Sequence, residues 1–320
     1  MSLFNRKYLL TLSSTINLPP DPLQPYTNSV AQGFEGVPRA VESFEISELR
    51  VSATVKVSEN NSNSAYTEIN IYNATEEVKS KLVSPDVYIT LSAGYEKNIL
   101  TGEVTSIFDL PTIFSGDVID SFTKKEGSDY ITTIRAKDSE VAKRDSYMSA
   151  MYNGGQTITY ILEDIVNRFL PKVSLGKLEL GPMSIPKQRL NNPYLAYGRV
   201  RDVLKELSED FGFIWYIVGN KFYAQPPNFG RAREFVEITP SDVIGDLTPA
   251  NGTNHTAKPE DAKAGLKFRV FLNGRIDLSK YIKITGFSED DNGDYKVIDL
   301  QHSLDTRGQN WYTEITAEGI

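Results

Sequence analysis

The chain has 320 residues, of which 40% are hydrophobic and 24% charged, with a formal net charge of −8 and no cysteine. This length is enough for two or three domains with their own cores, and the absence of cysteine excludes disulfides and thiolate metal sites. The negative charge disfavours sequence-independent DNA binding, which depends on release of phosphate counterions by basic side chains. No apolar run approaches the ~20 residues of a membrane span, and no cleavage site follows the apolar patch in residues 1–14. We therefore expect neither stable membrane insertion nor a signal peptide.

Strands are predicted on both sides of a proline-rich segment near the start of the chain. The first strand is LFNRKYLLTL at residues 3–12. Residues 15–43 are rich in Pro, Gly, Asn and Ser, so we expect a long extended arm there. Such an arm could wrap a neighbouring subunit or be disordered. Strands resume at 44–57, where apolar residues alternate, and a polar turn follows at 58–64.

The stretch from Ala65 to Asp138 organises the chain. Its first strand ends at Asn73, which together with Glu76 is predicted to cap a short helix. A second alternating strand spans 87–95. Two more strands follow, with the cores LTGEVTSI and FSGDVIDSFTKK, and then YITTIRAKDS.

The two strands LTGEVTSI and FSGDVIDS carry glycines at matching places, Gly102 and Gly116, each followed by a carboxylate and a valine. A glycine inside a strand marks a bulge, a bend or a close backbone approach, which a small, tightly curved barrel needs. Ordinary strand glycines would give the same pattern. We expect valine at either position to damage folding or assembly.

The region 146–227 changes from strand to helix spacing. Apolar residues at i, i+3 and i+4 predict a helix from Ile158 that is stopped by Pro171, and a second helix over 200–211 that is stopped by Gly212. The segments FIWYIVG and KFYAQPP then predict a hairpin around a Gly-Asn turn. This is the pattern of a small α+β module.

Four aromatic residues in that hairpin have two interpretations. They could form a sugar-stacking platform, but aromatic residues at alternating strand positions more often lie in a core, and we favour the core. The residues are Trp215, Tyr216, Phe222 and Tyr223.

The region 228–320 returns to strands. One strand is predicted in REFVEITPSDVIG, and four more in LKFRVFLNG, KYIKITGF, DYKVIDLQHSLD and QNWYTEITAEG. Asn292 and Gly293 predict a hairpin turn between two of these strands. A calcium loop is disfavoured, because the sixth position counted from Asp290 is Tyr295 where an EF-hand needs glycine.

These elements predict an α+β, mainly β protein in which two antiparallel tube-type β-barrels flank a small helix-containing module. The predicted domains are a first barrel with its arm at 1–145, the α+β module at 146–227 and a second barrel at 228–320.

No catalytic, cofactor-binding or metal-ligating residue is predicted. The chain has two histidines, His255 in a polar loop and His302 on a strand. Ser303 follows His302 directly and would point to the opposite face of the strand, so a triad with Asp299 or Asp305 is disfavoured. No nucleophile elbow, phosphate loop, dinucleotide fingerprint or zinc spacing is present. A pair of carboxylates brought together by folding leaves no sequence trace, so glycoside hydrolysis stays open.

The order INIYN, short helix, YITLSAGY, LTGEVTSI, FSGDVIDS, YITTIRAKDS resembles the first barrel of phage tail baseplate hub proteins. That family includes the late-control protein D group and the hubs of contractile tails. Residues 295–317 resemble the last hairpin of the family's second barrel. The resemblance covers most of the chain in element order.

The resemblance implies a structural, non-enzymatic protein of the virion tail baseplate, assembled in the host cytoplasm. It implies a homotrimeric ring that joins a six-fold tail tube to a three-fold central spike around the DNA channel. The implied partners are the tail tube or tube-initiator protein and the central spike protein, with tape measure and wedge proteins as further candidates. An acidic channel wall could let DNA slide past, although negative charge could equally serve solubility.

Two other classes of function remain as alternatives. A tail-associated peptidoglycan hydrolase needs a cleft with a perturbed carboxylate, and a host-glycan-binding adhesin needs exposed aromatic residues over a polar groove.

Overall fold

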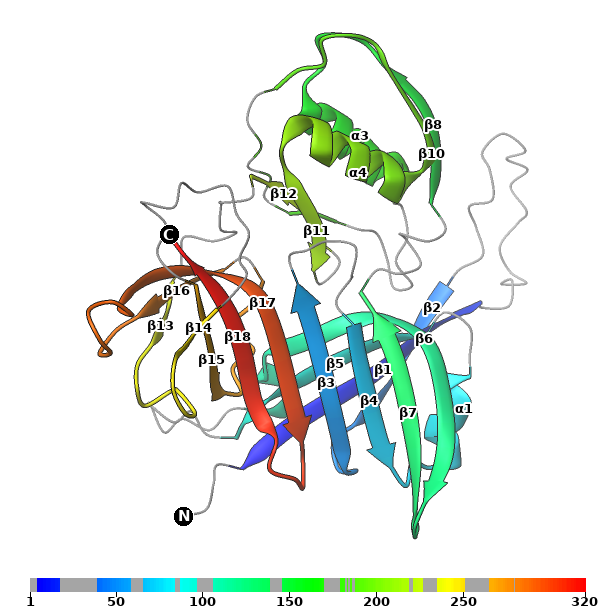
Figure 1. Ribbon diagram of the computed structural model, residues 1–320. Coiled ribbons are helices and arrows are strands. Elements are labelled where there is room, and N and C mark those ends of the chain that lie inside the picture. Colours follow the sequence, from blue (N-terminus) through cyan, green and yellow to red (C-terminus); the bar gives the residue numbers. More distant parts are fainter. Residues whose placement is uncertain are drawn as a thin grey trace.

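The computed structural model describes residues 5–17, 39–58, 66–83, 87–96, 106–138, 146–169, 179–181, 183, 185, 188–218, 221–226, 235–250, 265–278 and 280–320. Thirteen strands form one sheet, in which β13 and β16 are parallel and all other neighbours antiparallel. The path is β14-β15-β18-β17-β3-β4-β7-β6-β5-β1-β2, with β16 on β17 and β13 on β16 (Figure 1). The strands are β1 (Arg6–Asn17), β2 (Arg39–Ile46), β3 (Val51–Ser58), β4 (Tyr66–Tyr72), β5 (Tyr88–Tyr95), β6 (Thr112–Glu126), β7 (Asp129–Lys137), β13 (Phe235–Ile238), β14 (Thr248–Pro249), β15 (Leu266–Phe271), β16 (Tyr281–Ile284), β17 (Gly293–Asp305) and β18 (Trp311–Gly319).

The mainly β, antiparallel class is confirmed, but the sheet does not divide into two separate, closed barrels. One half of the sheet surrounds a core that includes Leu10, Val55 and Ile134, and the other surrounds a core that includes Ile282 and Ile315. The two halves are continuous because β17 pairs with β3.

Strand β17 changes partner along its length. Its first residues pair with β16, as far as Lys296 opposite Tyr281. A register shift against β18 lies between Val297 and Asp299. From Asp299 onwards β17 pairs with β3, so its second half belongs to the N-terminal half of the sheet. A bulge bends a strand and increases its twist, which lets one strand serve both halves.

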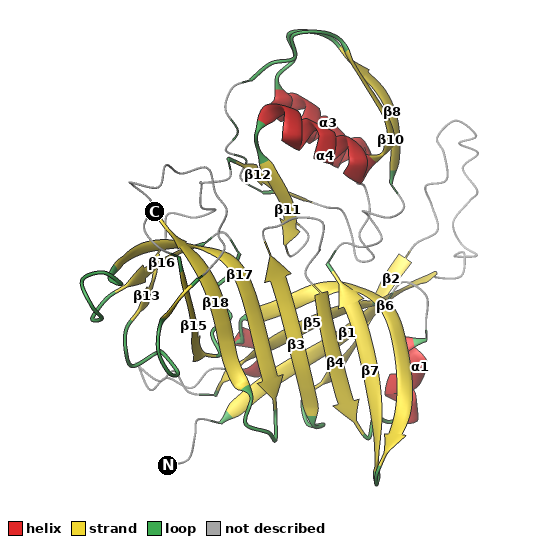
Figure 2. Ribbon diagram, viewed as in Figure 1, coloured by secondary structure: helices red, strands yellow, loops and turns green. Residues whose placement is uncertain are grey.

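A smaller module with its own core lies beyond one end of the strands (Figure 2). The helices α3 (Ile158–Phe169) and α4 (Val200–Phe211) confirm the predicted spacing. Gly212 ends α4 in the left-handed conformation, with φ 63°. The sequence did not predict the antiparallel ribbon of β8 (Tyr147–Tyr152) and β10 (Tyr194–Arg199), nor the short β9 (Glu179–Leu180). No helix in the described ranges is long and apolar enough to cross a membrane.

The aromatic residues of the module's hairpin are buried, so the core interpretation is confirmed and the sugar platform is wrong for them. The hairpin consists of β11 (Ile214–Val218) and β12 (Lys221–Gln225). Trp215 stacks on Phe222 with ring centroids 5.9 Å apart, on the side of the module's core. Tyr216 stacks on Tyr223 at 5.4 Å, and this pair packs with Leu278 of the β15–β16 connection. The two faces of one hairpin therefore join the module to the sheet.

The predicted cap of the first helix was wrong by two residues. Helix α1 (Glu76–Leu82) begins after Thr75, whose hydroxyl accepts the N–H of Val78 at 3.3 Å. Asn73 instead has φ 55° and accepts the N–H of Tyr130 at 2.9 Å, which ties the end of β4 to β7. An asparagine tolerates this conformation, and its amide bonds a neighbouring strand here.

The predicted arm at 15–43 is partly strand. Strand β1 continues to Asn17 and β2 begins at Arg39, with these two residues opposite each other. Residues 18–38 lie outside the described residues, as do Gly102 and the helical turn expected at 139–144. The strand expected in LTGEVTSI also falls there, except for its end, where Ser106 caps a 3-10 turn, η1 (Ile107–Asp109).

The hairpin expected at Asn292–Gly293 joins β16 to β17, but its loop is longer than two residues. Ile284 pairs with Gly293, so the loop spans 285–292. The Asn292 side chain accepts the N–H of Phe287 at 2.9 Å and donates to its carbonyl at 3.1 Å. Asn292 thus closes the loop through its side chain.

Candidate functional site

The strands β15, β18, β17, β3, β4 and β7 lie side by side in the sheet (Figure 1). Together they carry polar side chains on their outward face. Side chains alternate along each strand, so Val55 and Ile69 enter the core while Thr54 and Glu68 face outward. The register places Thr54 between Glu68 of β4 and Ser303 of β17. The face therefore crosses the boundary between the two halves without interruption.

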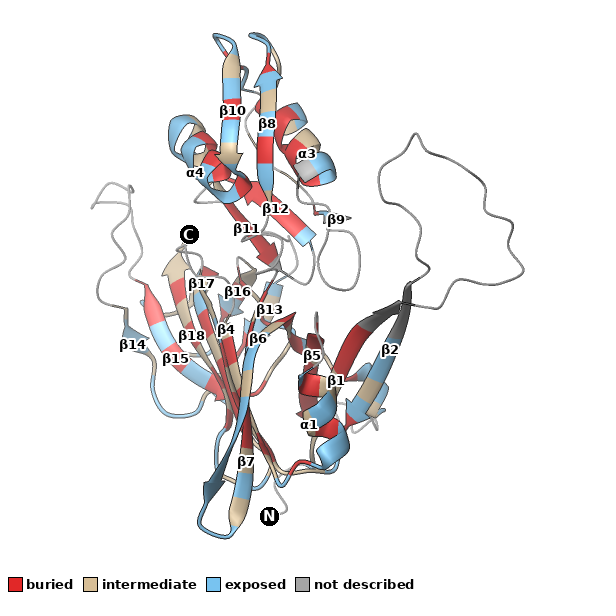
Figure 3. Ribbon diagram, turned by 90° about the vertical axis from the view of Figure 1, so that its right-hand side faces the viewer, coloured by how far each residue is buried: buried red, intermediate tan, exposed pale blue. Residues whose placement is uncertain are grey.

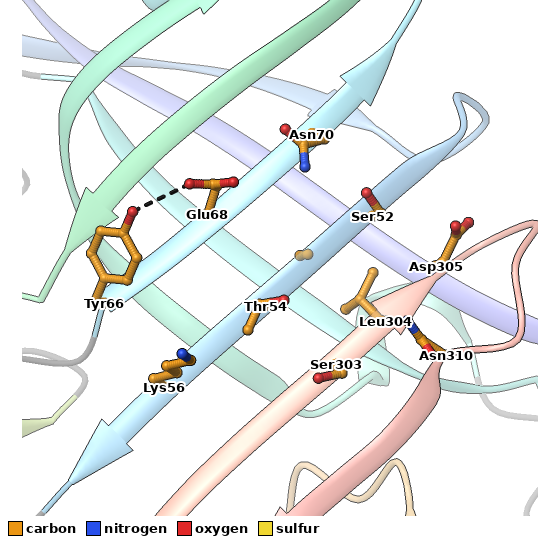
Figure 4. Close-up of a pocket in the computed structure, with 11 residues that line it drawn as sticks. Ser52, Thr54, Lys56, Tyr66, Glu68, Asn70, Ser303, Leu304, Asp305 and Asn310 are labelled. Atoms are coloured by element: carbon orange, nitrogen blue, oxygen red, sulfur yellow. Dashed lines mark hydrogen bonds between the residues drawn. The ribbon is translucent and has the colours of Figure 1, made fainter.

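Two adjoining hollows lie on this face. One, of about 410 Å³, lies over β3, β4 and β17 and is lined by hydroxyl, amide and carboxylate groups (Figure 4). In it the Tyr66 hydroxyl donates to Glu68 at 3.4 Å. The other, of about 560 Å³, extends towards β15 and β18 and shares Lys56 and Tyr66 with the first. A polar hollow like the first suits a wetted surface more than an apolar ligand.

Charges of both signs alternate across the face. Glu314 forms salt bridges with Lys267 at 2.9 Å and Arg269 at 2.7 Å, and Arg135 pairs with Glu68 at 3.4 Å. Burial raises the pKa of Glu314, but the hydrogen bonds from the two cations outweigh it and hold the pKa below its usual value. The carboxylates of Glu68, Asp305 and Glu314 on this face are therefore each paired with a cation, unlike those of the acidic wall considered from net charge.

Asp305, at the end of β17, fastens the C-terminal half of the sheet to the N-terminal half. Its carboxylate accepts a hydrogen bond from the Arg50 guanidinium at 3.0 Å. It also accepts hydrogen bonds from the backbone N–H groups of Arg307 and Gly308, each at 2.9 Å. Arg6 of β1 donates to the Gly308 carbonyl at 2.6 Å. Burial raises the pKa of Asp305, but the bonds from Arg50 and the two N–H groups outweigh it, so the pKa lies below its usual value.

We expect Asp305→Asn to lower the free energy of unfolding at pH 7 by about 1.5–3 kcal/mol, the range for hydrogen bonds to a charged group. A carboxylate with a lowered pKa stabilises the fold above its unfolded pKa of about 4 and loses this effect as the pH falls through the folded pKa. The two proteins should therefore converge in stability below about pH 4. Urea unfolding at pH 7, 5 and 3 measures this, and an equal difference at every pH would contradict it.

His302 has a structural position. Its ring is fully buried, and Nδ1 lies 2.9 Å from the Thr313 hydroxyl. Burial lowers the pKa of His302 to about 4. Ser303, Asp299 and Asp305 point to the other face of β17, so the structure does not assemble a triad. His255 lies outside the described residues, and within those residues no three His, Asp or Glu side chains gather as a metal site would require.

Gly116 lies where β6 crosses close to β7. A Cβ built on it would be 2.5 Å from the Lys137 carbonyl oxygen and 2.8 Å from the Phe114 ring. The main chain of β7 leaves no room for a side chain here.

No protein-family model matches the sequence, and no curated protein does. Solved structures do match. A 43 kDa tail protein of prophage MuSo2 from Shewanella oneidensis aligns with 86% of this chain and 93% of its own, at 9% identity and a TM-score of 0.56. A tail protein of Neisseria meningitidis MC58 aligns with the same shares at 8% identity and a TM-score of 0.57.

The E. coli c3393 protein, a component of the type VI secretion system with structural similarity to the T4 tail proteins gp27 and gp5, aligns with 85% of this chain and 73% of its own. Its identity is 13% and its TM-score 0.56. The chain has the fold of phage tail proteins. The resemblance to baseplate hub proteins is thereby confirmed at the level of the fold.

Sequence reasoning did not find the polar face of this tail-protein fold. The alternation in β3 and in the second half of β17 was visible separately. The pairing of Ser303 with Thr54, on which the continuous face depends, has no local signal because the two strands lie far apart in sequence.

Proposed function

We propose that the chain is a structural baseplate hub subunit of a phage tail, three copies of which form a ring between a six-fold tail tube and a three-fold spike. In this proposal the polar face lines the DNA channel. The observation that carries it is the single sheet shared by two halves with one uninterrupted polar face. The tail-protein fold supports it.

A match between three copies and a six-fold tube requires two similar halves in each copy. We propose the domains 1–145, 146–227 and 228–320, and the three separate hydrophobic cores support this division. Trp311 and Leu304 nonetheless pack in the first core, so the outer two domains are interlocked. Three copies would present six sheet halves to a six-fold tube, and head-to-tail contacts would close the ring.

The mixed charges of the polar face suit passage of DNA. A wall with excess lysine and arginine would hold phosphates by counterion release, and a strongly acidic wall would repel them. The salt-bridged pairs on this face neither hold phosphates by counterion release nor repel them strongly. The proposed mechanism is assembly and channel formation without a catalytic step.

The proposed partners are the tail tube or tube-initiator protein and the central spike protein, with tape measure and wedge proteins as further candidates. The proposed location is the virion tail baseplate, after assembly in the host cytoplasm. The buried aromatic residues remove the platform on which the adhesin alternative depended. The hydrolase alternative needs a carboxylic acid with a raised pKa, whereas in the described part of the chain the pKa values of the clearly shifted carboxylates, Asp164, Asp305 and Glu314, are all lowered.

Lysines added to the polar face should slow DNA release without preventing assembly. We expect particles carrying Thr54→Lys with Gln301→Lys to assemble normally and to eject DNA severalfold more slowly, because each added cation can hold a phosphate. Ser80→Lys, on the exposed side of α1, is the control. If the double-lysine particles and the Ser80→Lys particles both eject DNA at the wild-type rate, the polar face does not line the channel.

A further inference from the structure

The ribbon of β8 and β10 exposes an apolar face to solvent. Tyr147, Met151, Leu195 and Tyr197 are 61%, 68%, 60% and 77% exposed. Register places Met151 opposite Leu195, and Tyr197 opposite Ser149, so these side chains share one face. The other face of the ribbon packs on the module's core. Contiguous exposed patches of this kind mark interaction sites.

Two arginines lie at the ends of this ribbon, and the Asp202 carboxylate is a neighbour of one of them, Arg199. Arg199 lies opposite Tyr147 and donates to its hydroxyl at 3.1 Å. At the other end of the ribbon, Arg189 donates to the Gly155 carbonyl at 2.7 Å. A guanidinium has five donors, so each arginine can also bind a carboxylate. The ribbon therefore suits a surface that combines apolar side chains with carboxylates.

The β13–β16 side of the same chain has that composition. Phe235 is 48% exposed and stacks on Tyr281 at 5.5 Å, and Ile244 is 40% exposed. The carboxylate of Glu237 on β13 and that of Asp246, in the segment that follows β13, are exposed.

This side keeps an excess of negative charge. Lys283 is the register partner of Glu237. The hydrogen bond that the Glu237 carboxylate accepts at 2.9 Å comes from the Thr285 hydroxyl, which carries no charge. Asp294 lies opposite Lys283 in turn, and Glu289 and Asp290 are exposed in the adjoining loop.

The two surfaces lie on opposite sides of the molecule. In Figure 1 the β8–β10 ribbon is at the right of the module, and β13 and β16 are at the far left. Figure 3 turns the right-hand side to the viewer and shows β8 and β10 in front of the helices. A head-to-tail ring of identical copies requires two different, complementary surfaces on each copy.

We propose that the outward face of β8–β10 in one copy docks on the β13–β16 surface of a second copy, with Arg199 meeting Glu237 and Asp246. This interface rests on the proposed ring and specifies its contacts. Apolar residues form its centre and the charges fix its direction.

Light scattering of the full chain over a concentration series tests the interface. Wild type should form trimers. We expect Leu195→Ser with Tyr197→Ser to raise the concentration of half-dissociation at least about tenfold, because buried aromatic and aliphatic anchors dominate interface energy. Both side chains are exposed in one copy, so at concentrations where both proteins are monomers their thermal unfolding temperatures should be equal. Val83→Ser, at an 81% exposed valine outside both surfaces, should leave the trimer intact.

A charge exchange tests which surfaces meet. Arg199→Glu alone, and Glu237→Arg with Asp246→Arg, should each weaken the trimer, and the combination of all three changes should restore it. Failure of the combination to restore assembly would overturn the pairing of these surfaces. If wild type is a trimer and the Leu195→Ser, Tyr197→Ser variant assembles equally well, the proposed interface is overturned but the proposed ring is not. A wild-type monomer at every concentration would overturn both.

Discussion

Replacing Trp311 by alanine should lower the free energy of unfolding by about 3–5 kcal/mol, as expected for removal of a buried tryptophan. Trp311 begins β18, a strand of the C-terminal half, yet its ring is 3% exposed and packs in the core of the N-terminal half. Its loss should therefore destabilise strands that are remote from it in sequence. Hydrogen exchange should show faster exchange at amides of β1, β3 and β4.

Two variants isolate the packing effect. The Trp311 indole N–H is buried and has no hydrogen-bond partner among the described residues, so Trp311→Phe should lose much less stability than Trp311→Ala. Tyr312→Ala, one residue later on the polar face, should cost only about 0.5–1 kcal/mol through its contact with Arg269. Unchanged exchange in β1, β3 and β4 of Trp311→Ala would show that the two halves are energetically independent.

Gly116→Val should destabilise the protein by about 3 kcal/mol or more, at or above the upper end of the overpacking range. A Cβ at this position would meet the carbonyl oxygen of Lys137, which belongs to the backbone of β7 and cannot move away as a side chain could. The substitution must therefore disrupt either the β6–β7 pairing or the whole fold. Urea unfolding and the yield of soluble protein measure the effect.

Lys124→Val is the matched control for this prediction. It places the same side chain on the same strand, at an exposed position, and should change the free energy of unfolding by no more than about 0.5 kcal/mol. If Gly116→Val unfolds at the same urea concentration as Lys124→Val, β6 and β7 do not approach as closely as the structure places them.

The local elements could be predicted from the sequence because their signals are local. Helix α4 follows from apolar spacing and from Gly212, whose left-handed conformation ends it. The buried pair Trp215 and Phe222 follows from strand alternation. The prediction for Asn73 was wrong because asparagine is favoured both as a helix cap and where a side chain bonds a neighbouring strand. Tertiary contacts decide between the two roles.

The organisation of the sheet could not be predicted in the same way. The strand pattern predicted two barrels, whereas the structure has one continuous sheet. The sheet is continuous because β17 pairs with β3, and this pairing depends on contacts between the two ends of the chain. The polar face is a consequence of that pairing, so it was not visible either. The β8–β10 ribbon was missed because its outward residues, Met151, Leu195 and Tyr197, are apolar and hide the alternation that marks a half-buried strand.

The most direct test of the proposed hub function is a cryo-electron microscopy reconstruction of the purified, assembled protein. We expect a three-fold ring in which the polar face around Thr54, Lys56 and Gln301 lines a central channel and the six sheet halves form one collar. A closed assembly with that face on its outer surface, or particles of a single copy at all concentrations, would contradict it.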